Sequence, residues 1–307
     1  MSQYFKFLPY ILCAAPCLMV LFAYGLFIYR EMRARDPILP LRLFKKNNFT
    51  TANVSGFLLG VSMFGVIIYI PFYLQGVMAL SGLYSGTMMM TMTVTLVSAS
   101  ALAGRAISRT GHYKFFGILG IALMVAGMFW MSRLQPDSAA LTVYLRLIIF
   151  GSGLGISFTI STFAVQLDVG HAHAGLAISS SQLFRQIGGT VGVSLFGKIF
   201  TALFAAKIAA IPLPAQLPAA QLLATNPRML LDSHALAGLS SAVPKEGLSI
   251  FFEFVRLCRQ SLGESLDTLF FYGCGILLLA LAVALFMHEY PLKDESAKSE
   301  LNPREVA

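Results

Sequence analysis

A single arginine stands inside an apolar stretch that is long enough to cross a lipid bilayer. At 1.5 Å of rise per residue, about ten residues of helix would carry Arg185, in the run 175–206, roughly 15 Å into the hydrocarbon. A charge at that depth costs about 2.5–3.5 kcal/mol to insert, and such charges mark binding sites, ion paths or partner charges. Arg185 is therefore the first candidate for a binding residue.

The composition is that of an integral membrane protein. The 307 residues are 57% hydrophobic and 12% charged, against about 25% charged in an ordinary soluble domain. The mean hydropathy is +0.74. The net charge of +8 is explained by basic loops that orient the spans, so it does not indicate nucleic-acid binding. The four cysteines imply no disulfide framework.

Seven apolar runs predict an all-α integral membrane fold with seven transmembrane helices. They cover residues 8–29, 50–75, 83–104, 115–134, 141–164, 175–206 and 267–288. The first is too long for a signal-peptide core, so we interpret it as a retained span. Between the last two runs, residues 211–245 are proline-rich and irregular. The pattern of 246–262 predicts an amphipathic helix on the outer membrane surface, and its charges weigh against an eighth span.

The basic residues predict the orientation of the spans. Lys and Arg are abundant after the first and third runs and in the C-terminal tail, whereas the opposite short segments hold only Lys6 and Arg133. By the positive-inside rule the C-terminus is cytoplasmic, and seven spans then place the N-terminus outside.

Five short motifs occur in order along the chain. They are Asp36–Phe44, Tyr69–Gln75, Gly104–Lys114, Arg146 with the glycines at 151, 153 and 155, and Arg185–Gly189. In order and spacing they resemble the C-terminal half of the fourteen-span drug:proton antiporters of the major facilitator superfamily, over nearly the whole chain. The chain departs from the family pattern at Ser108, where the family has an acid, at His112, where it has a basic residue, and at Gly151, which falls one residue late.

The resemblance implies a fold of two six-helix bundles with two linker spans between them. This chain would supply one linker span and the six-helix C-terminal bundle. The expected parts are a linker helix and basic cytoplasmic loop (1–48), five bundle helices (49–206), an extracytoplasmic loop with the amphipathic helix (207–266), the last span (267–288) and a cytoplasmic tail (289–307).

The resemblance also implies transport by alternating access, with protons moving inward and a lipophilic drug moving out across a bacterial cytoplasmic (inner) membrane. No substrate bond is changed, so no enzyme and no cofactor beyond the proton gradient is expected. The expected partners are the lipid bilayer, a small lipophilic substrate, and an N-terminal bundle or another membrane subunit. The alternative is a truncated, nonfunctional or partner-dependent half-transporter.

Two groups of residues are candidates for the transport machinery. Those expected to line the substrate cavity are Arg185, Gln75, Tyr69, Tyr73, Gln182, Gln166 and Met88. Those expected to gate conformational change are Pro71, Gly104, Arg109, Gly111, Lys114, Arg146, Gly151, Gly155, Gly188 and Gly192.

Each group has a simpler alternative. Proline removes a backbone donor and can kink a helix, and glycines permit close helix packing or bending. The segment 104–114 is either a charged latch between helices that biases the inward or outward state, or a tight basic turn. Arg146 could extend its charge outward to water. The methionines could be ordinary core or lipid-facing residues.

The acidic residues set the remaining expectations. None of the 14 is predicted near mid-bilayer, and Glu264 and Asp267 are expected at the start of the last span. We therefore expect the proton-carrying carboxylate to lie outside this chain. Arg185 would be met by glutamines, carbonyls, water, an anionic substrate or an acid on another bundle.

Other classes of protein fit less well. His171 and His173 beside Asp168 are typical of solvated loop residues rather than a metal site. A retinal receptor would need a lysine midway along the last span, and residues 268–287 contain none.

Overall fold

The computed structural model describes residues 47–169, 174–211, 233–241 and 247–287, with Leu230, Val243 and isolated residues before position 46. The chain divides into two units, residues 1–46 and 47–307, which are described separately. In the first unit the described residues are too few to delimit the predicted span 8–29, most of which lies outside them. Arg33 there stacks on Tyr29, with its Cζ 4.6 Å from the ring centroid.

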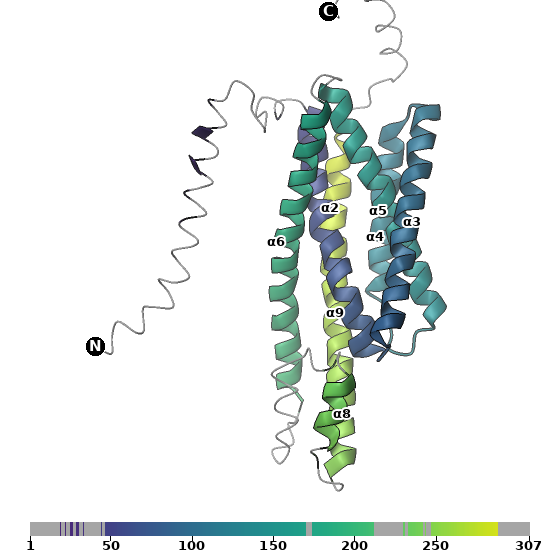
Figure 1. Ribbon diagram of the computed structural model, residues 1–307, viewed down its shortest axis with the longest axis vertical. Helices are drawn as coiled ribbons and strands as arrows, with labels where there is room; N and C mark the ends of the chain where they lie inside the picture. The colour runs from purple at the N-terminus through teal and green to yellow at the C-terminus, as the bar shows by residue number, and fades with distance from the viewer. Residues whose placement is uncertain are drawn as a thin grey trace, which may run out of the picture. The chain divides into compact units, whose positions relative to one another are not determined.

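The second unit is a bundle of long helices, and its described part contains no strand (Figure 1). The elements are α2 (Asn47–Pro71), the π-helix η2 (Phe72–Val77), α3 (Gly82–Thr110), α4 (Tyr113–Met131), α5 (Ala140–Val169), α6 (Ala174–Ala209), α8 (Ser233–Ser241) and α9 (Leu248–Leu285). Six helices of the described chain are long and apolar enough to cross a membrane: α2 continued by η2, α3, α4, α5, α6 and α9. The prediction of an all-α integral membrane bundle is confirmed.

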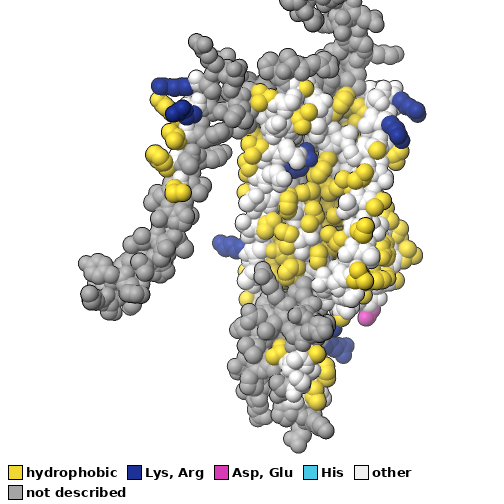
Figure 2. Space-filling model, in the orientation of Figure 1, with side chains coloured by type: hydrophobic (Ala, Val, Ile, Leu, Met, Phe, Trp, Pro, Cys, Tyr) yellow, Lys and Arg dark blue, Asp and Glu magenta, His cyan; other side chains and the backbone are white. Residues whose placement is uncertain are grey.

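The helices are arranged around α2 and α5. Helix α2 packs on α6, α9 and α5, while α3 and α4 both pack on α5. Figure 2 shows hydrophobic side chains gathered over the middle of one face and basic side chains over the upper end of α3. That end carries Arg105 and Arg109, and we call it the basic end of the bundle.

Glycines allow these helices to approach at backbone distance. A Cβ added at Gly188 of α6 would lie 2.1 Å from the carbonyl oxygen of Phe57 on α2. A Cβ at Gly155 of α5 would lie 2.2 Å from the carbonyl oxygen of Leu96 on α3. Lipid tails are as apolar as leucine, so helices in a bilayer associate largely by close packing and small residues line their contacts. Gly192 and Gly151 occupy similar crossings on the same two helix pairs.

Pro71 changes the course of its helix, as its chemistry predicts. The α-helical hydrogen-bond pattern ends at this residue and the six residues of η2 follow. The Met78 N–H then donates to the Tyr73 carbonyl at 3.1 Å, a bond across five residues. Proline lacks an N–H and its ring crowds the preceding turn, so the regular hydrogen-bond pattern is weakened at this point of the span. The chain leaves this turn through Ala79, which has a φ of 55°.

The segment 104–114 forms a tight turn between α3 and α4. Gly111 adopts the left-handed conformation with a φ of 74°, and its N–H donates to the Ile107 carbonyl at 2.8 Å. This is the glycine cap expected at a helix C-terminus. Arg109 is exposed and Lys114 half-buried, and neither forms an ion pair with any described acid.

The expectation of a separate surface helix at 246–262 is wrong. Those residues form the first part of α9, which continues without a break to Leu285. Phe251, Val255 and Leu262 are buried in the bundle core. At 1.5 Å per residue, α9 is about 57 Å long and α6 about 54 Å, against a hydrocarbon core of about 30 Å. Both therefore extend past the other helices at the end opposite the basic end (Figure 1).

The glycine crossing of α2 and α6 gives the first prediction. We expect Gly188→Ala to lower the free energy of unfolding by about 1–3 kcal/mol, because its methyl group meets a backbone carbonyl that cannot rotate away. The measurement is thermal or denaturant unfolding of the purified chain in detergent, followed by circular dichroism.

Gly175 supplies the matched control on the same helix, since an added Cβ there has nothing within 4 Å. Gly175→Ala should stay within about 0.5 kcal/mol of the parent. Equal stability of the two variants would contradict the close crossing.

Candidate functional site

Arg185 is buried deep in the bundle and lies over an aromatic ring. Its side chain is 8% exposed, and its Cζ lies 3.9 Å from the centroid of the Phe158 ring on α5. Its Nε has no hydrogen-bond partner among the described residues. Eleven residues of helix separate Arg185 from the start of α6, which places it about 16 Å from that end.

The contact with Phe158 compensates only part of the free-energy cost of burying the Arg185 charge. A desolvated cation–π contact contributes about 2 kcal/mol. Inserting an arginine near mid-bilayer costs about 2.5–3.5 kcal/mol, so the ring offsets part of that cost. The ion pair found in the described part of the chain joins Lys207 to Glu264, far along α6 from Arg185. The Arg185 guanidinium therefore keeps hydrogen-bonding capacity for water, a substrate or a partner side chain.

Phe158 also lines an open cavity between α3 and α5. It has a volume of about 360 Å³ and is lined by Phe158 with Ser100, Thr159, Thr162, Phe163 and Gln166. The hydroxyl oxygens of Ser100 on α3 and Thr159 on α5 are 2.7 Å apart. Small-molecule pockets span about 300–1,000 Å³, so this cavity is of sufficient size. Phe158 thus links two of the predicted residues, Arg185 and Gln166.

Exposed polar side chains run along one side of α6. Their spacing of three or four residues places them on one helix face, and they are Ser179, Gln182, Gln186, Thr190 and Ser194. We call this set the α6 polar stripe. Three of its hydroxyls donate to carbonyls one turn back within the helix. The amides of Gln182 and Gln186 cannot be satisfied by lipid, so this face requires water or a protein partner.

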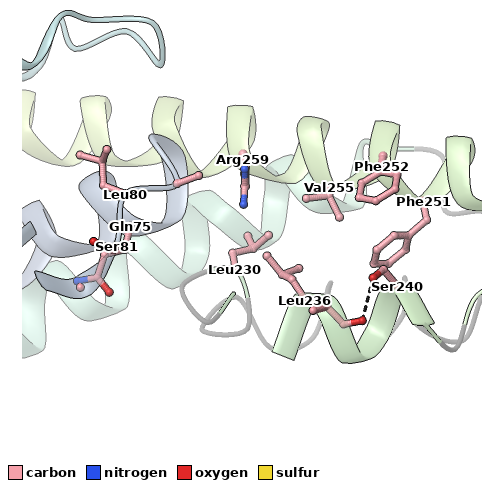
Figure 3. A pocket seen from close by; sticks show the side chains of 13 residues that line it. Gln75, Leu80, Ser81, Leu230, Leu236, Ser240, Phe251, Phe252, Val255 and Arg259 are labelled. Carbon is pink, nitrogen blue, oxygen red and sulfur yellow. Dashed lines mark hydrogen bonds between the residues drawn. The ribbon is translucent and has the colours of Figure 1, made fainter. Parts of the chain in front are cut away.

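Gln75 lies in a different cavity, at the end opposite the basic end. That cavity has a volume of about 560 Å³ between η2, α8 and α9. In Figure 3, Gln75 and Ser81 lie on one side, Arg259 lies at the middle, and Phe251, Phe252 and Val255 lie on the other side. The Gln75 amide donates to the hydroxyl of Ser85 at 3.3 Å.

The remaining predicted cavity residues are packed rather than open. Met88 is completely buried in the core. Tyr69 is 6% exposed and stacks with Phe72 and Phe200, with ring centroids 5.8 and 5.4 Å away. Tyr73 is completely buried, and its hydroxyl has no partner among the described atoms. The structure therefore distributes the predicted residues among a central region, the cavity at the opposite end and the core.

Arg146 does not reach outward to water. It is 5% exposed and its Cζ lies 5.4 Å from the Trp130 ring centroid on α4. The outward extension considered from the sequence is wrong, because α4, α5 and η2 enclose this side chain. Two residues beside the predicted arginines were not singled out from the sequence. Phe158 lies under Arg185, and Asp267 interacts electrostatically with Arg146. A lone phenylalanine carries no sequence signal, and the wrong start for the last helix placed Asp267 at a helix end.

The described helices thus combine six spans of membrane-crossing length, a buried arginine and exposed amide side chains on α6. This combination defines an integral membrane protein that carries polar groups along its spans. Residues 5–193 match the model of the Major Facilitator Superfamily, and the chain belongs to this family of membrane transporters.

Several curated relatives align with most of the chain. The multidrug transporter protein MdtP of Bacillus subtilis is 31% identical over 92% of this chain and 53% of its own length. The uncharacterized MFS-type transporter Rv1877 of Mycobacterium tuberculosis is 30% identical over 89% of this chain and 37% of its own. A tetracycline resistance determinant of Streptomyces rimosus is 25% identical over 95% of this chain and 87% of its own. The chain thus spans about half the length of MdtP and a smaller share of the length of Rv1877.

The contact between Arg185 and Phe158 gives the second prediction. A double-mutant cycle with Arg185→Gln and Phe158→Leu should give a coupling energy of about 1–2 kcal/mol, because the guanidinium–ring contact is desolvated. The measurement is the free energy of unfolding of the four proteins in bicelles.

An exposed pair of the same kind is the control. Arg133 lies over Phe129, with 5.4 Å from Cζ to the ring centroid, and Phe129 is 44% exposed. Its coupling energy should be at most about 0.5–1 kcal/mol. A coupling at Arg185 no larger than at Arg133 would show that the buried contact contributes nothing special.

Proposed function

We propose that this chain forms one bundle of a proton-driven exporter that moves small lipophilic compounds out across a bacterial cytoplasmic membrane. The family membership supports transport as the activity. Two aligned relatives are named as a multidrug transporter and a tetracycline resistance determinant, which supports drugs as the cargo. The movement is alternating access, in which two bundles rock about a shared central path.

The observation that carries the proposal is the position of Arg185 beside the α6 polar stripe. A buried charge with free donors and a row of exposed amides and hydroxyls are both costly next to lipid. Their cost is avoided when this side of the bundle faces a water-filled path. In that arrangement Arg185 binds a carbonyl, phosphate or carboxylate of the cargo, and the Phe158 ring contacts its apolar part.

The second wall of the path is supplied by another bundle. Helices α3 and α6 are the least buried of the six described spans. The family resemblance implies that α3 and α6 are among the helices that line the central cavity. A chain that spans about half the length of MdtP therefore works with an N-terminal bundle or another membrane subunit. The alternative is a chain that is inactive without this partner.

The orientation follows from the positive-inside rule. The turn with Arg105, Arg109 and Lys114 faces the cytoplasm, and the cavity with Gln75 faces outward.

The third prediction tests export directly. Cells lacking their own efflux pumps, loaded with ethidium as a lipophilic fluorescent cation, express this chain together with the N-terminal half of MdtP. We expect ethidium efflux that stops when a protonophore collapses the proton gradient. Arg185→Gln should reduce the efflux rate to that of cells with an empty vector.

Arg133→Gln, at the exposed end of α4, is the matched control and should leave efflux unchanged. Efflux from the chain expressed alone would identify a self-sufficient bundle and overturn the need for a partner. Absence of efflux in every combination, with both halves present in the membrane, would overturn the exporter assignment.

A further inference from the structure

Two buried polar side chains and one half-buried carboxylate lie at the end opposite the basic end, away from Arg185. Tyr73 comes from η2, Arg146 from α5 and Asp267 from α9. Arg146 is 5% exposed and Tyr73 is completely buried. Among the described residues, no hydrogen-bond partner is found for Nε and Nη1 of Arg146, for the Tyr73 hydroxyl or for the buried Oδ1 of Asp267. We call these three side chains the outer cluster.

The members of the outer cluster interact without direct contact. Asp267 and Arg146 attract each other electrostatically, and both act on Tyr73. Arg146 and Asp267 nevertheless form no direct ion pair. Buried polar atoms in native proteins are nearly always satisfied by protein or ordered water. The unpaired donor, acceptor and hydroxyl on these three helical elements therefore require water or another polar partner.

A cavity connects this group to the outward side. It has a volume of about 490 Å³, room for several waters at about 30 Å³ each. Tyr73 and Asp267 are among its walls, together with Asp137 from the loop between α4 and α5. Asp267 lies eighteen residues before the end of α9, about 27 Å from the basic end. The carboxylate is therefore placed near the outer boundary of the hydrocarbon.

We propose that Asp267, held opposite Arg146 and Tyr73, is a proton-binding site that takes up protons from the outward-facing cavity. A hydronium ion in the cavity gives its proton to a carboxylate oxygen of Asp267, leaving a neutral carboxylic acid and a water molecule. Arg146 keeps its charge throughout, since arginine is not deprotonated in proteins. The proposal deepens the proposed function, on which its role in transport rests.

Protonation changes the electrostatic surroundings of Arg146. With Asp267 ionised, its carboxylate attracts the Arg146 guanidinium. With Asp267 neutral, that attraction is lost and the Arg146 charge depends on Trp130 and water. A ligand shifts a conformational equilibrium only when its affinity differs between the two states, and the proton meets this condition when Asp267 and Arg146 lie closer in one state than in the other.

Other charges also face the site and set the background of its titration. They are Glu264 and Lys207, which are paired with each other, and Asp137, Arg256 and Arg259, which line the same cavity as Asp267. Glu264 is exposed and already bound to Lys207 and Gln260. Among these acids Asp267 alone interacts with buried Arg146.

The protein contains its own reporter for the test. Trp130 is the single tryptophan of the sequence, and the Arg146 guanidinium lies against its ring. The purified chain in lipid nanodiscs is titrated from alkaline to acidic pH while its tryptophan fluorescence is recorded. We expect a one-proton transition in the parent, its loss in Asp267→Asn, and a displaced transition in Asp267→Glu, which keeps the acid.

Asp137→Asn is the matched control, because it removes an acid from the same cavity wall and should keep the transition. Infrared spectra supply a readout independent of Trp130: a protonated carboxyl band should appear on acidification in the parent and be missing in Asp267→Asn. A transition and band that persist in Asp267→Asn would overturn the proposal, and circular dichroism verifies that each variant is folded.

The titration does not require transport, so it tests the proton site at Asp267 independently of the proposed export. An Asp267-dependent transition without ethidium efflux would leave the proton site standing and overturn the exporter. Efflux driven by the proton gradient that Asp267→Asn leaves at the parent rate would overturn the coupling role of the site.

Discussion

The close crossing of α2 and α6 is the contact on which the position of Arg185 depends. A Cβ at Gly60 of α2 would lie 2.2 Å from the Arg185 carbonyl oxygen, and Gly188 meets α2 one turn later. Packing at backbone distance is what holds helices together in lipid, where apolar burial gives no driving force between them. The same contact fixes the height and rotation of α6. It therefore holds the Arg185 side chain on Phe158 and presents the α6 polar stripe on the open side of the bundle.

Two regions of buried charge divide the bundle along its axis. At mid-depth, Arg185 has an aromatic ring and no described acid, which suits a site whose counterpart arrives with a substrate or a partner. Toward the other end, Arg146 has both an aromatic ring and a carboxylate across a gap. Effective desolvation penalties are several kcal/mol per buried ion, so neither arrangement is explained by stability alone. Their separation would let the proposed cargo site at Arg185 and the proposed proton site at Asp267 act at different heights of the bundle.

The sequence was a good guide wherever one helix decides the outcome. Pro71 predicted a disturbance of its helix, and Gly111 a tight turn, because both effects arise within a few residues of backbone. The last helix was less predictable. Its first part, 248–262, is amphipathic whether it lies on a membrane or stands upright against neighbours, and periodicity alone does not separate these cases. Contacts of Phe251 and Leu262 with the bundle core decide for the upright helix.

The amino-acid sequence by itself determined the class of the protein, the family resemblance, the course of most bundle helices and the place of Arg185 along its helix. These depend on hydropathy, residue spacing and helical rise, which are local quantities. The tertiary structure alone decided which side chains meet: Phe158 under Arg185, Trp130 beside Arg146, and Asp267 facing Arg146 from another helix. Those encounters depend on the rotation of each helix about its axis. That rotation is set by the glycine crossings between distant segments, so no single stretch of sequence contains it.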